Sequence, residues 1–207
     1  IVIMQGKRIV FIEPNQVELK AFEFDEQDVG PEDVLIETTH SLISPGTELA
    51  CLSGMESWAP MPFVPGYAGC GLVMQVGSDV EELSPGDRVF SYTKHASHVK
   101  ASRLAMPIPD GLDPSLALFA RMAAVSITAL RASDAELGDT VAVIGLGLVG
   151  NLCAQLFGLI GCRVVGIDLS AARCQVARQC GLEYVMNCGA EEAIDAVADL
   201  TDGKMCE

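Results

Sequence analysis

Three glycines, at residues 145, 147 and 150, mark the segment of this chain whose chemistry is easiest to specify. They lie in Gly145-Leu146-Gly147-Leu148-Val149-Gly150, which fits the pattern G-x-G-x-x-G between an apolar run and a helical one. The first glycine permits a tight turn, the second lets a pyrophosphate approach the backbone, and the third allows close packing of helix on sheet. Free amides at the helix start attract phosphates. These six residues are predicted to bind a dinucleotide; a strand–turn–helix connection without a ligand is the alternative.

Asp168 follows the second apolar run of the same region, where a buried strand is expected to end. A carboxylate at that place accepts hydrogen bonds from the 2′-hydroxyl of an adenosine ribose. It also repels a 2′-phosphate, so the sequence favours NAD over NADP. Leu169 and Arg173 are included in the expected site, Arg173 as a group that stacks on adenine or offsets the charge of Asp168. The alternative is that Asp168 is a solvated strand end or a helix cap.

The spacing of apolar residues, which predicts the elements that position this site, changes along the chain from a strand-like to a helix-like period. Strands are expected at 8–12, 17–24, 34–39, 71–76 and 88–92, with turns at 44–46 and 84–87, which is typical of a small barrel or sandwich. From Asp113, a helix cap, a helix is expected over 114–132. Strands at 141–144, 164–167 and 184–186 then alternate with helices that follow residue 148 and span 170–180 and 191–200. This order predicts a doubly wound parallel sheet, its first strand buried on both faces. The expected domains are 1–118 and 119–207.

Composition excludes several classes of function. Asp and Glu number 28 against 13 Lys and Arg, a formal net charge of −15, which disfavours nucleic-acid and membrane partners. The eight cysteines form no C-x-x-C pair and lie mostly in apolar surroundings, which indicates reduced, buried thiols and a cytoplasmic protein. Residues 141–167 are apolar enough to suggest a membrane span, but their glycines and polar residues favour a soluble strand–helix–strand unit.

The order of several short motifs resembles the medium-chain dehydrogenase/reductase superfamily, which includes zinc alcohol dehydrogenases and quinone oxidoreductases. The motifs are Ser44-Pro45-Gly46-Thr47-Glu48, Pro62-Phe63-Val64-Pro65-Gly66-Tyr67-Ala68-Gly69, Val76-Gly77-Ser78, Pro85-Gly86-Asp87-Arg88-Val89-Phe90, Pro107-Ile108-Pro109-Asp110-Gly111-Leu112 and Gly138-Asp139-Thr140-Val141. The resemblance implies an N-terminal GroES-like β domain followed by the first half of a Rossmann sheet. It also implies a longer parent protein, a homo-oligomer, of which this chain is a part.

The zinc ligands of that superfamily do not carry over. Pro45, Tyr67 and Arg121 stand at or near the ligand places, and none of them suits a tetrahedral zinc site. His95 and His98 are interpreted as ordinary strand residues on opposite faces. Thr47 takes the place of the family's proton-relay hydroxyl, so Thr47 and Tyr67 are the catalytic candidates, with packing or turn formation as the alternative.

The resemblance implies an oxidoreductase without zinc that transfers a hydride between NAD(H) and an alcohol or carbonyl substrate, a small-molecule partner. An NADPH-dependent quinone or enone reductase is one alternative, and a non-catalytic nucleotide-binding protein is another. Met55, Trp58, Met61 and Phe63 form either an apolar wall for the substrate or simple loop packing.

Overall fold

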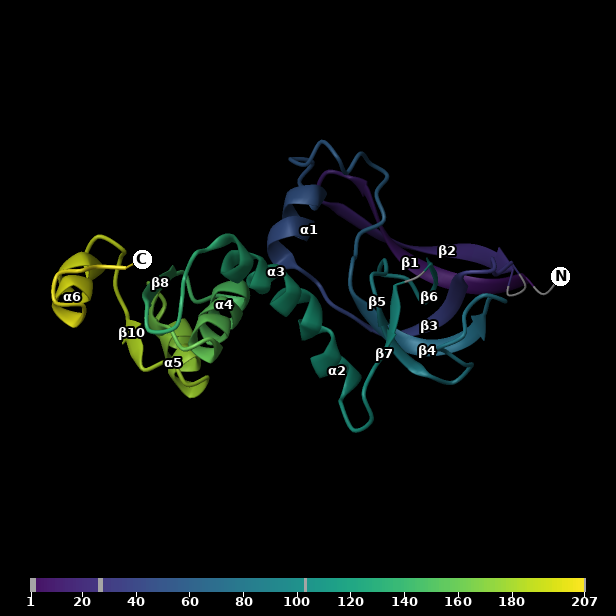
Figure 1. The fold of residues 1–207 in the computed structure, drawn as a ribbon. Coiled ribbons are helices and arrows are strands. Elements are labelled where there is room, and N and C mark those ends of the chain that lie inside the picture. Colours follow the sequence, from purple (N-terminus) through teal and green to yellow (C-terminus); the bar gives the residue numbers. More distant parts are fainter. Residues whose placement is uncertain (1–2, 26–27, 103, 207) are drawn as a thin grey trace. The chain divides into compact units, whose positions relative to one another are not determined.

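The computed structural model describes residues 3–25, 28–102 and 104–206, which form two compact units (Figure 1). The first unit is Ile1–Phe119 and the second is Ala120–Glu207. The first is rich in β structure, and the second alternates strands with helices. The predicted sequence of a β-rich part followed by an α/β part is therefore confirmed.

The first unit is built from antiparallel strands. A hairpin pairs β1 (Ile3–Glu13) with β2 (Gln16–Asp25). A five-stranded sheet has the order β6-β3-β4-β5-β7. Its strands are β3 (Asp33–Ser41), β4 (Gly69–Val76), β5 (Arg88–Ser91), β6 (His98–Ser102) and β7 (Ala105–Pro107). The sequence did not predict β7, and it expected a strand at His95 to His98, whereas β6 begins only at His98; both strands are short and lie at the edges of the sheet.

Two helices complete the first unit. The expected turn at 44–46 is wrong, because Ser44 is the N-cap of helix α1 (Pro45–Leu52). Proline suits a first helical position, where its missing N–H would have no partner. The turn at 84–87 is confirmed by the bond that the Asp87 amide donates to the Ser84 carbonyl, 3.1 Å long. Helix α2 (Pro114–Ala117) starts at the predicted Asp113 cap, whose carboxylate accepts from the Ser115 amide at 2.7 Å.

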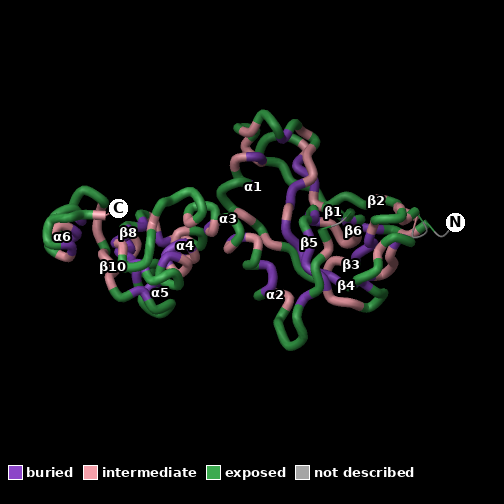
Figure 2. The backbone as a smooth tube through the Cα atoms, in the orientation of Figure 1, coloured by how far each residue is buried: buried purple, intermediate pink, exposed green. Residues whose placement is uncertain are grey.

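The second unit contains a parallel sheet in the order β10-β9-β8. Its strands are β8 (Thr140–Ile144), β9 (Arg163–Ile167) and β10 (Tyr184–Met186), and its helices are α3 (Phe119–Ala132), α4 (Leu148–Leu159), α5 (Ala171–Gln179) and α6 (Ala193–Leu200). Helices α4 and α5 pack with Val143 and Val164 in one core cluster, while α6 packs with Val165 and Ile167 in another. Because side chains alternate along a strand, these clusters lie on opposite faces of the sheet, as doubly wound topology requires. Figure 2 shows the buried residues following these strands and helices.

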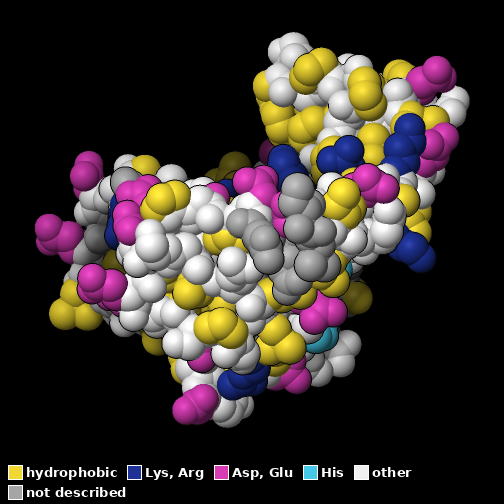
Figure 3. Space-filling model, turned by 90° about the vertical axis from the view of Figure 1, so that its right-hand side faces the viewer, with side chains coloured by type: hydrophobic (Ala, Val, Ile, Leu, Met, Phe, Trp, Pro, Cys, Tyr) yellow, Lys and Arg dark blue, Asp and Glu magenta, His cyan; other side chains and the backbone are white. Residues whose placement is uncertain are grey.

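Strand β8 is not buried on both faces, contrary to the prediction. Val141 and Val143 are buried, but Ala142 is exposed and Ile144 is 68% exposed. The reason is that α6 covers β9 and β10 on the second face, whereas β8 is an edge strand of the described sheet. Hydrophobic side chains also reach the surface on the face drawn in Figure 3, where acidic side chains are scattered rather than gathered in one patch.

One helical stretch among the described residues, Pro114–Ala132, is long and apolar enough to cross a membrane by length and composition alone. Core helices of folded domains pass the same test, so this is weak evidence for a span. The apolar run 141–167 is divided among β8, α4 and β9, as the sequence predicted.

Gly150 offers a direct test of how α4 packs on the sheet. A Cβ at this residue would lie 1.8 Å from the Gly145 carbonyl oxygen, so Gly150→Ala must displace the backbone. We expect the free energy of unfolding to fall by about 1 to 3 kcal/mol, as for other overpacked sites. The measurement is chemical denaturation followed by circular dichroism.

Gly158→Ala is the matched control, because Gly158 lies in the same helix and has no atom within 4 Å of the added Cβ. This variant should gain roughly 0.5–1 kcal/mol from the better helix propensity of alanine. Equal stability of the two variants would contradict the packing argument.

Candidate functional site

The glycine loop leaves β8 and enters α4 with the backbone that its sequence predicts. Gly145 has a φ of +92°, a conformation that side chains oppose, and its amide donates to the Ile167 carbonyl at 2.8 Å. Gly147 is the N-cap of α4 at φ −65° and ψ −174°, with no side-chain cap. The first amides of α4 lack acceptors inside the helix, as at any helix start, so a phosphate here would meet free N–H groups and the positive end of the helix dipole.

The loop's second and third glycines meet different constraints. A Cβ on Gly150 would collide with the backbone of Gly145, whereas a Cβ on Gly147 would have no atom within 4 Å. Gly150 is therefore required by packing. Gly147 is not, and its absent side chain leaves open space beside the helix start, where a pyrophosphate would approach.

The remaining loop residues contribute their backbones. Leu146 is only 2% exposed and its side chain belongs to the core, so its part in the site is to anchor the loop rather than to contact a ligand with its side chain. Leu148 and Val149 are about half exposed, at 45% and 43%.

The carboxylate of Asp168 joins the end of β9 to this loop. Its Oδ2 accepts from the Leu146 amide at 2.7 Å, and its Oδ1 accepts from the Ser170 amide at 2.7 Å. The two amides lower the pKa of Asp168 from its usual 3.8, Ser170 having the larger effect, and together with Arg173 they outweigh the opposing effect of burial. Asp168 is only 7% exposed, so it is not a solvated strand end. Its bond from the Ser170 amide at the start of α5 agrees with the other alternative, a helix cap. A carboxylate accepts about four hydrogen bonds, which leaves capacity for ribose hydroxyls.

Arg173 and Leu169 lie beside Asp168 at the start of α5. The Arg173 guanidinium Nη1 is 3.6 Å from Asp168 Oδ2, while its side chain remains 61% exposed. Leu169 is 80% exposed. The predicted cap Ser170 accepts from the Arg173 amide at 3.5 Å and so starts the helix that carries Arg173. The structure therefore brings the glycine loop, Asp168 and Arg173 together at the carboxyl ends of β8 and β9, the edge where α/β sheets bind ligands.

The two catalytic candidates lie in the first unit in different surroundings. Thr47 is exposed on α1. Tyr67 is partly buried and packs against the apolar cluster that contains Phe90 and Leu118.

Among the described residues, no three His, Cys, Asp or Glu side chains are grouped to hold a metal ion. Pro45, the first residue of α1, and Tyr67 stand where the sequence comparison placed zinc ligands. They supply neither a thiolate nor an imidazole, so they do not fit a catalytic zinc.

A buried polar chain in the first unit was missed by sequence reasoning. His95 is not a strand residue, since β6 begins only at His98, and it is buried to 9% exposure. Its Nε2 lies 2.9 Å from Glu48 Oε2 and its Nδ1 lies 2.8 Å from Ser41 Oγ. The sequence did contain a signal for a helix start here, because Pro45 suits the first position of a helix and Glu48 its first turn. That signal would have placed Glu48 on α1, where its carboxylate is buried.

Most cysteines are buried thiols, as predicted. Five of the eight are buried, and all eight are free. Burial raises the pKa of Cys70 to about 11, so this thiol stays protonated at neutral pH. Met61 and Phe63 pack with Phe11 in a loop cluster, which supports the packing alternative for them, while Met55 and Trp58 are exposed.

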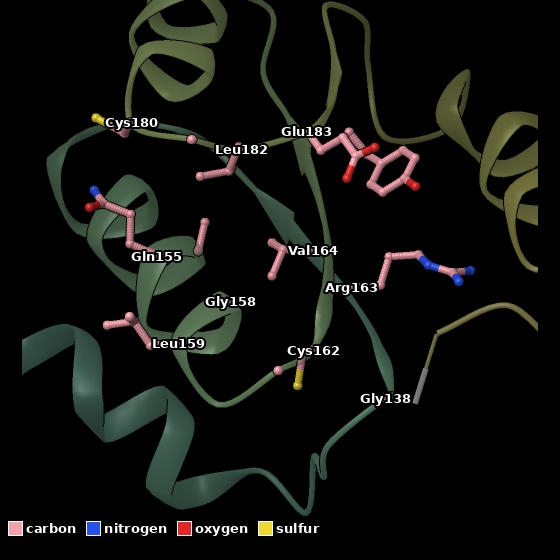
Figure 4. Close-up of a pocket in the computed structure, with 14 residues that line it drawn as sticks. Gly138, Gln155, Gly158, Leu159, Cys162, Arg163, Val164, Cys180, Leu182 and Glu183 are labelled. Atoms are coloured by element: carbon pink, nitrogen blue, oxygen red, sulfur yellow. The ribbon is translucent and has the colours of Figure 1, made fainter.

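A cavity of about 580 Å³ lies at the opposite end of the second unit's sheet (Figure 4). It is lined by Gln155, Leu159, Cys180 and Glu183 among others, and by Arg163, where β9 begins. Because it is at the amino ends of the strands, this cavity is separate from the glycine loop.

Comparison with known proteins decides the family. The model of the alcohol dehydrogenase GroES-like domain matches residues 30–190, well over half of the chain. The chain belongs to the medium-chain dehydrogenase/reductase superfamily. The fold class predicted from the sequence, a GroES-like domain followed by part of a Rossmann sheet, is thereby confirmed.

Members of this superfamily that the chain resembles include enzymes of two activities. It is 26% identical over 176 residues to an alcohol dehydrogenase of Geobacillus stearothermophilus, covering 69% of this chain and 52% of that protein. It is 30% identical over 162 residues to a quinone oxidoreductase of Pseudomonas aeruginosa, covering 74% of this chain and 50% of that protein. The crystal structure of Escherichia coli quinone oxidoreductase complexed with NADPH has a TM-score of 0.80 at 22% identity, covering 96% of this chain and 63% of the other. The chain thus spans about half the length of these curated relatives.

The charge of Asp168 makes a pH-dependent contribution to stability. Its pKa is lower in the folded chain than in the unfolded one, so the carboxylate stabilises the fold above pH 3.8, and this contribution is lost as the pH falls through the lowered pKa. Asp168→Asn should reduce the free energy of unfolding at pH 7 by about 1 to 3 kcal/mol, typical of hydrogen bonds to a charged group. Denaturation of both proteins between pH 7 and pH 3 should show this difference shrinking with acidity.

Asp199→Asn, on the exposed side of α6, is the control and should keep wild-type stability at pH 7. A difference between Asp168→Asn and wild type that stays constant down to pH 3 would mean that the carboxylate's charge is not what stabilises the loop.

Proposed function

We propose that this chain is part of an NAD-preferring oxidoreductase that transfers a hydride between nicotinamide and an alcohol/carbonyl pair without catalytic zinc. The observation that supports it most is the position of Asp168, a carboxylate at the carboxyl end of β9 that is bonded directly to the glycine loop. This arrangement pairs a phosphate-binding helix start with an acceptor for ribose hydroxyls.

The residues of the second unit would hold the cofactor as follows. The helix start at Gly147 binds the pyrophosphate, Gly150 keeps α4 close to the sheet, and Asp168 accepts from the adenosine ribose. Leu169 and Arg173 flank the adenosine. When bound, the nicotinamide supplies the hydride chemistry, while the protein orients the cofactor and excludes water.

The first unit would supply the groups that contact the substrate oxygen. Thr47 and Tyr67 both carry hydroxyls, which donate hydrogen bonds to a developing alkoxide or carry its proton. The residue types at the zinc-ligand places, Pro45 and Tyr67, support a zinc-independent reaction. We propose a small alcohol or carbonyl compound as the substrate and a cytoplasmic homo-oligomer as the working enzyme.

An NADPH-dependent quinone or enone reductase is the second candidate. Arg173 favours this candidate, because its guanidinium lies 3.6 Å from Asp168. It could pair with a 2′-phosphate if the Asp168 side chain turned away. A quinone oxidoreductase with NADPH bound is also among the similar structures. The charge of Asp168 opposes a 2′-phosphate, so we place the NAD-dependent reaction first.

Asp168→Asn separates these two cofactor assignments. Loss of a hydrogen bond to a charged acceptor should weaken NADH binding about tenfold or more, while NADPH binding should improve relative to NADH. Titration followed by nicotinamide fluorescence measures both dissociation constants, after thermal melts have shown the variant folded at the assay temperature.

Glu183→Gln is the control, because it removes one exposed carboxylate from the opposite end of the sheet and should leave both constants unchanged. If the ratio of the NADH and NADPH dissociation constants is the same in Asp168→Asn as in the wild type, Asp168 does not select the cofactor. Steady turnover of any carbonyl compound by the wild type would exclude a binding-only protein.

Tyr67→Phe tests the first unit's part in the reaction. Loss of a proton donor should lower turnover by about a hundredfold, while the dissociation constant of NADH should stay within about twofold. Steady-state kinetics on the complete protein that carries this chain, with a panel of alcohols and ketones, gives the first quantity. Wild-type turnover in this variant would mean that Tyr67 serves only in packing and takes no part in the reaction.

A further inference from the structure

The end of β9 is held by the backbone of Asp168 as well as by its carboxylate. The Asp168 amide donates to the Met186 carbonyl at 3.1 Å, which extends the pairing of β9 with β10 by one bond. The Asp168 carbonyl accepts from the side-chain amide of Asn187, the residue that follows β10, with an Nδ2–O distance of 2.9 Å. A side chain from the neighbouring strand therefore supports the residue that carries the carboxylate of the site.

Asn187 supplies a bond that a longer strand would have supplied from its backbone. In a parallel pair, a residue donates to one partner and accepts from the amide two positions further along the neighbouring strand. Asp168 donates to Met186, so that second amide would belong to residue 188, but β10 ends at Met186. The Asn187 side chain gives the Asp168 carbonyl a donor beyond the end of the strand.

A second side chain also faces the Asp168 carbonyl. The buried thiol of Cys174 has its sulfur 3.4 Å from this oxygen and 3.5 Å from the Met186 carbonyl oxygen. A thiol has one proton for these two acceptors and is a weak donor. The Asn187 amide is therefore the stronger support. Asn187 is also exposed, so its replacement leaves the core intact.

The bond from Asn187 restrains the turn on which the Asp168 carboxylate depends. The peptide group that carries the Asp168 carbonyl leads to Ser170, whose amide returns to Asp168 Oδ1 at 2.7 Å. Holding this carbonyl limits rotation of the chain between Asp168 and Ser170, and so limits the direction of the carboxylate. The Arg173 guanidinium lies 3.6 Å from Oδ2, so a carboxylate held in place keeps Arg173 engaged.

We propose that Asn187 is a positioning residue that sets the discrimination between NAD and NADP. Its side-chain amide holds the Asp168 backbone, so the carboxylate stays where it accepts from a ribose hydroxyl and repels a 2′-phosphate. Asn187 acts through Asp168 and needs no contact of its own with the cofactor. This inference rests on the proposed function, because it assigns a further residue to the selection of that cofactor.

Asn187→Leu tests the proposal on the 207-residue chain, because leucine is similar in size to asparagine and cannot donate. Isothermal titration calorimetry gives the dissociation constants of NAD+ and NADP+. We expect the wild type to prefer NAD+, and the variant to lose about fivefold of that preference, as for the loss of one hydrogen bond. Without nucleotide, NMR should show shifts of the Ser170 amide and of the Asp168 carboxyl carbon in the variant.

Three further variants serve as controls. Asn187→Ala also removes the donor and should match Asn187→Leu, while Asn187→Gln keeps a side-chain amide and should stay within about twofold of the wild-type preference. Gln155→Leu is the matched control, because it also replaces an amide by leucine and removes one hydrogen bond, 2.7 Å long, to Asn151. Gln155 lines the cavity at the opposite end of the sheet, so this variant should keep the wild-type preference.

The outcomes distinguish this inference from the proposed function. A wild type that prefers NAD+, with the same preference in Asn187→Leu and Asn187→Ala, would overturn the role of Asn187 and leave the proposed function in place. An equal loss of preference in Gln155→Leu or in Asn187→Gln would also overturn it, since the side-chain donor would then not be the cause. A wild type without a preference for NAD+ would contradict the proposed function and this inference together.

Discussion

The hydrogen bonds of the Asp168 carboxylate hold together the part of this molecule where chemistry is expected. One oxygen fixes the second residue of the glycine loop, and the other fixes the residue that caps α5. The carboxylate thus sets both the loop that would meet the pyrophosphate and the helix that carries Arg173. Because it is buried beside two amides, its charge is stabilised in the folded chain. The local structure depends on this group, and so would the proposed preference for NAD.

The first unit is organised around a second buried carboxylate. Glu48 bonds the amide at the start of α1 and the ring of His95, and so ties this helix to the segment that precedes β6. Hydrogen bonds at both oxygens offset part of the cost of burying this acid, whereas removing one partner would leave a buried polar group uncompensated.

Local signals in the sequence predicted local structure well. Asp113 and Ser170 start helices, and Gly181 follows α5 at a φ of +93°, because caps and glycine turns depend on near neighbours. The glycine loop and Asp168 were found for the same reason, as each pattern follows a strand. His95 was misjudged because its partners are 47 and 54 positions away, and no local pattern reports them. The exposure of Ile144 likewise depends on which helix covers which strand.

Asp168 and the glycine loop are proposed to form one site for NAD. The most direct measurement is an amide NMR titration of the isotopically labelled chain with NAD+ and then with NADP+. We expect NAD+ to shift the amides of Leu146, Gly147 and Ser170 first and most, and NADP+ to produce these shifts only at much higher concentration. Equal responses to the two nucleotides, or shifts confined to residues away from the loop, would contradict it.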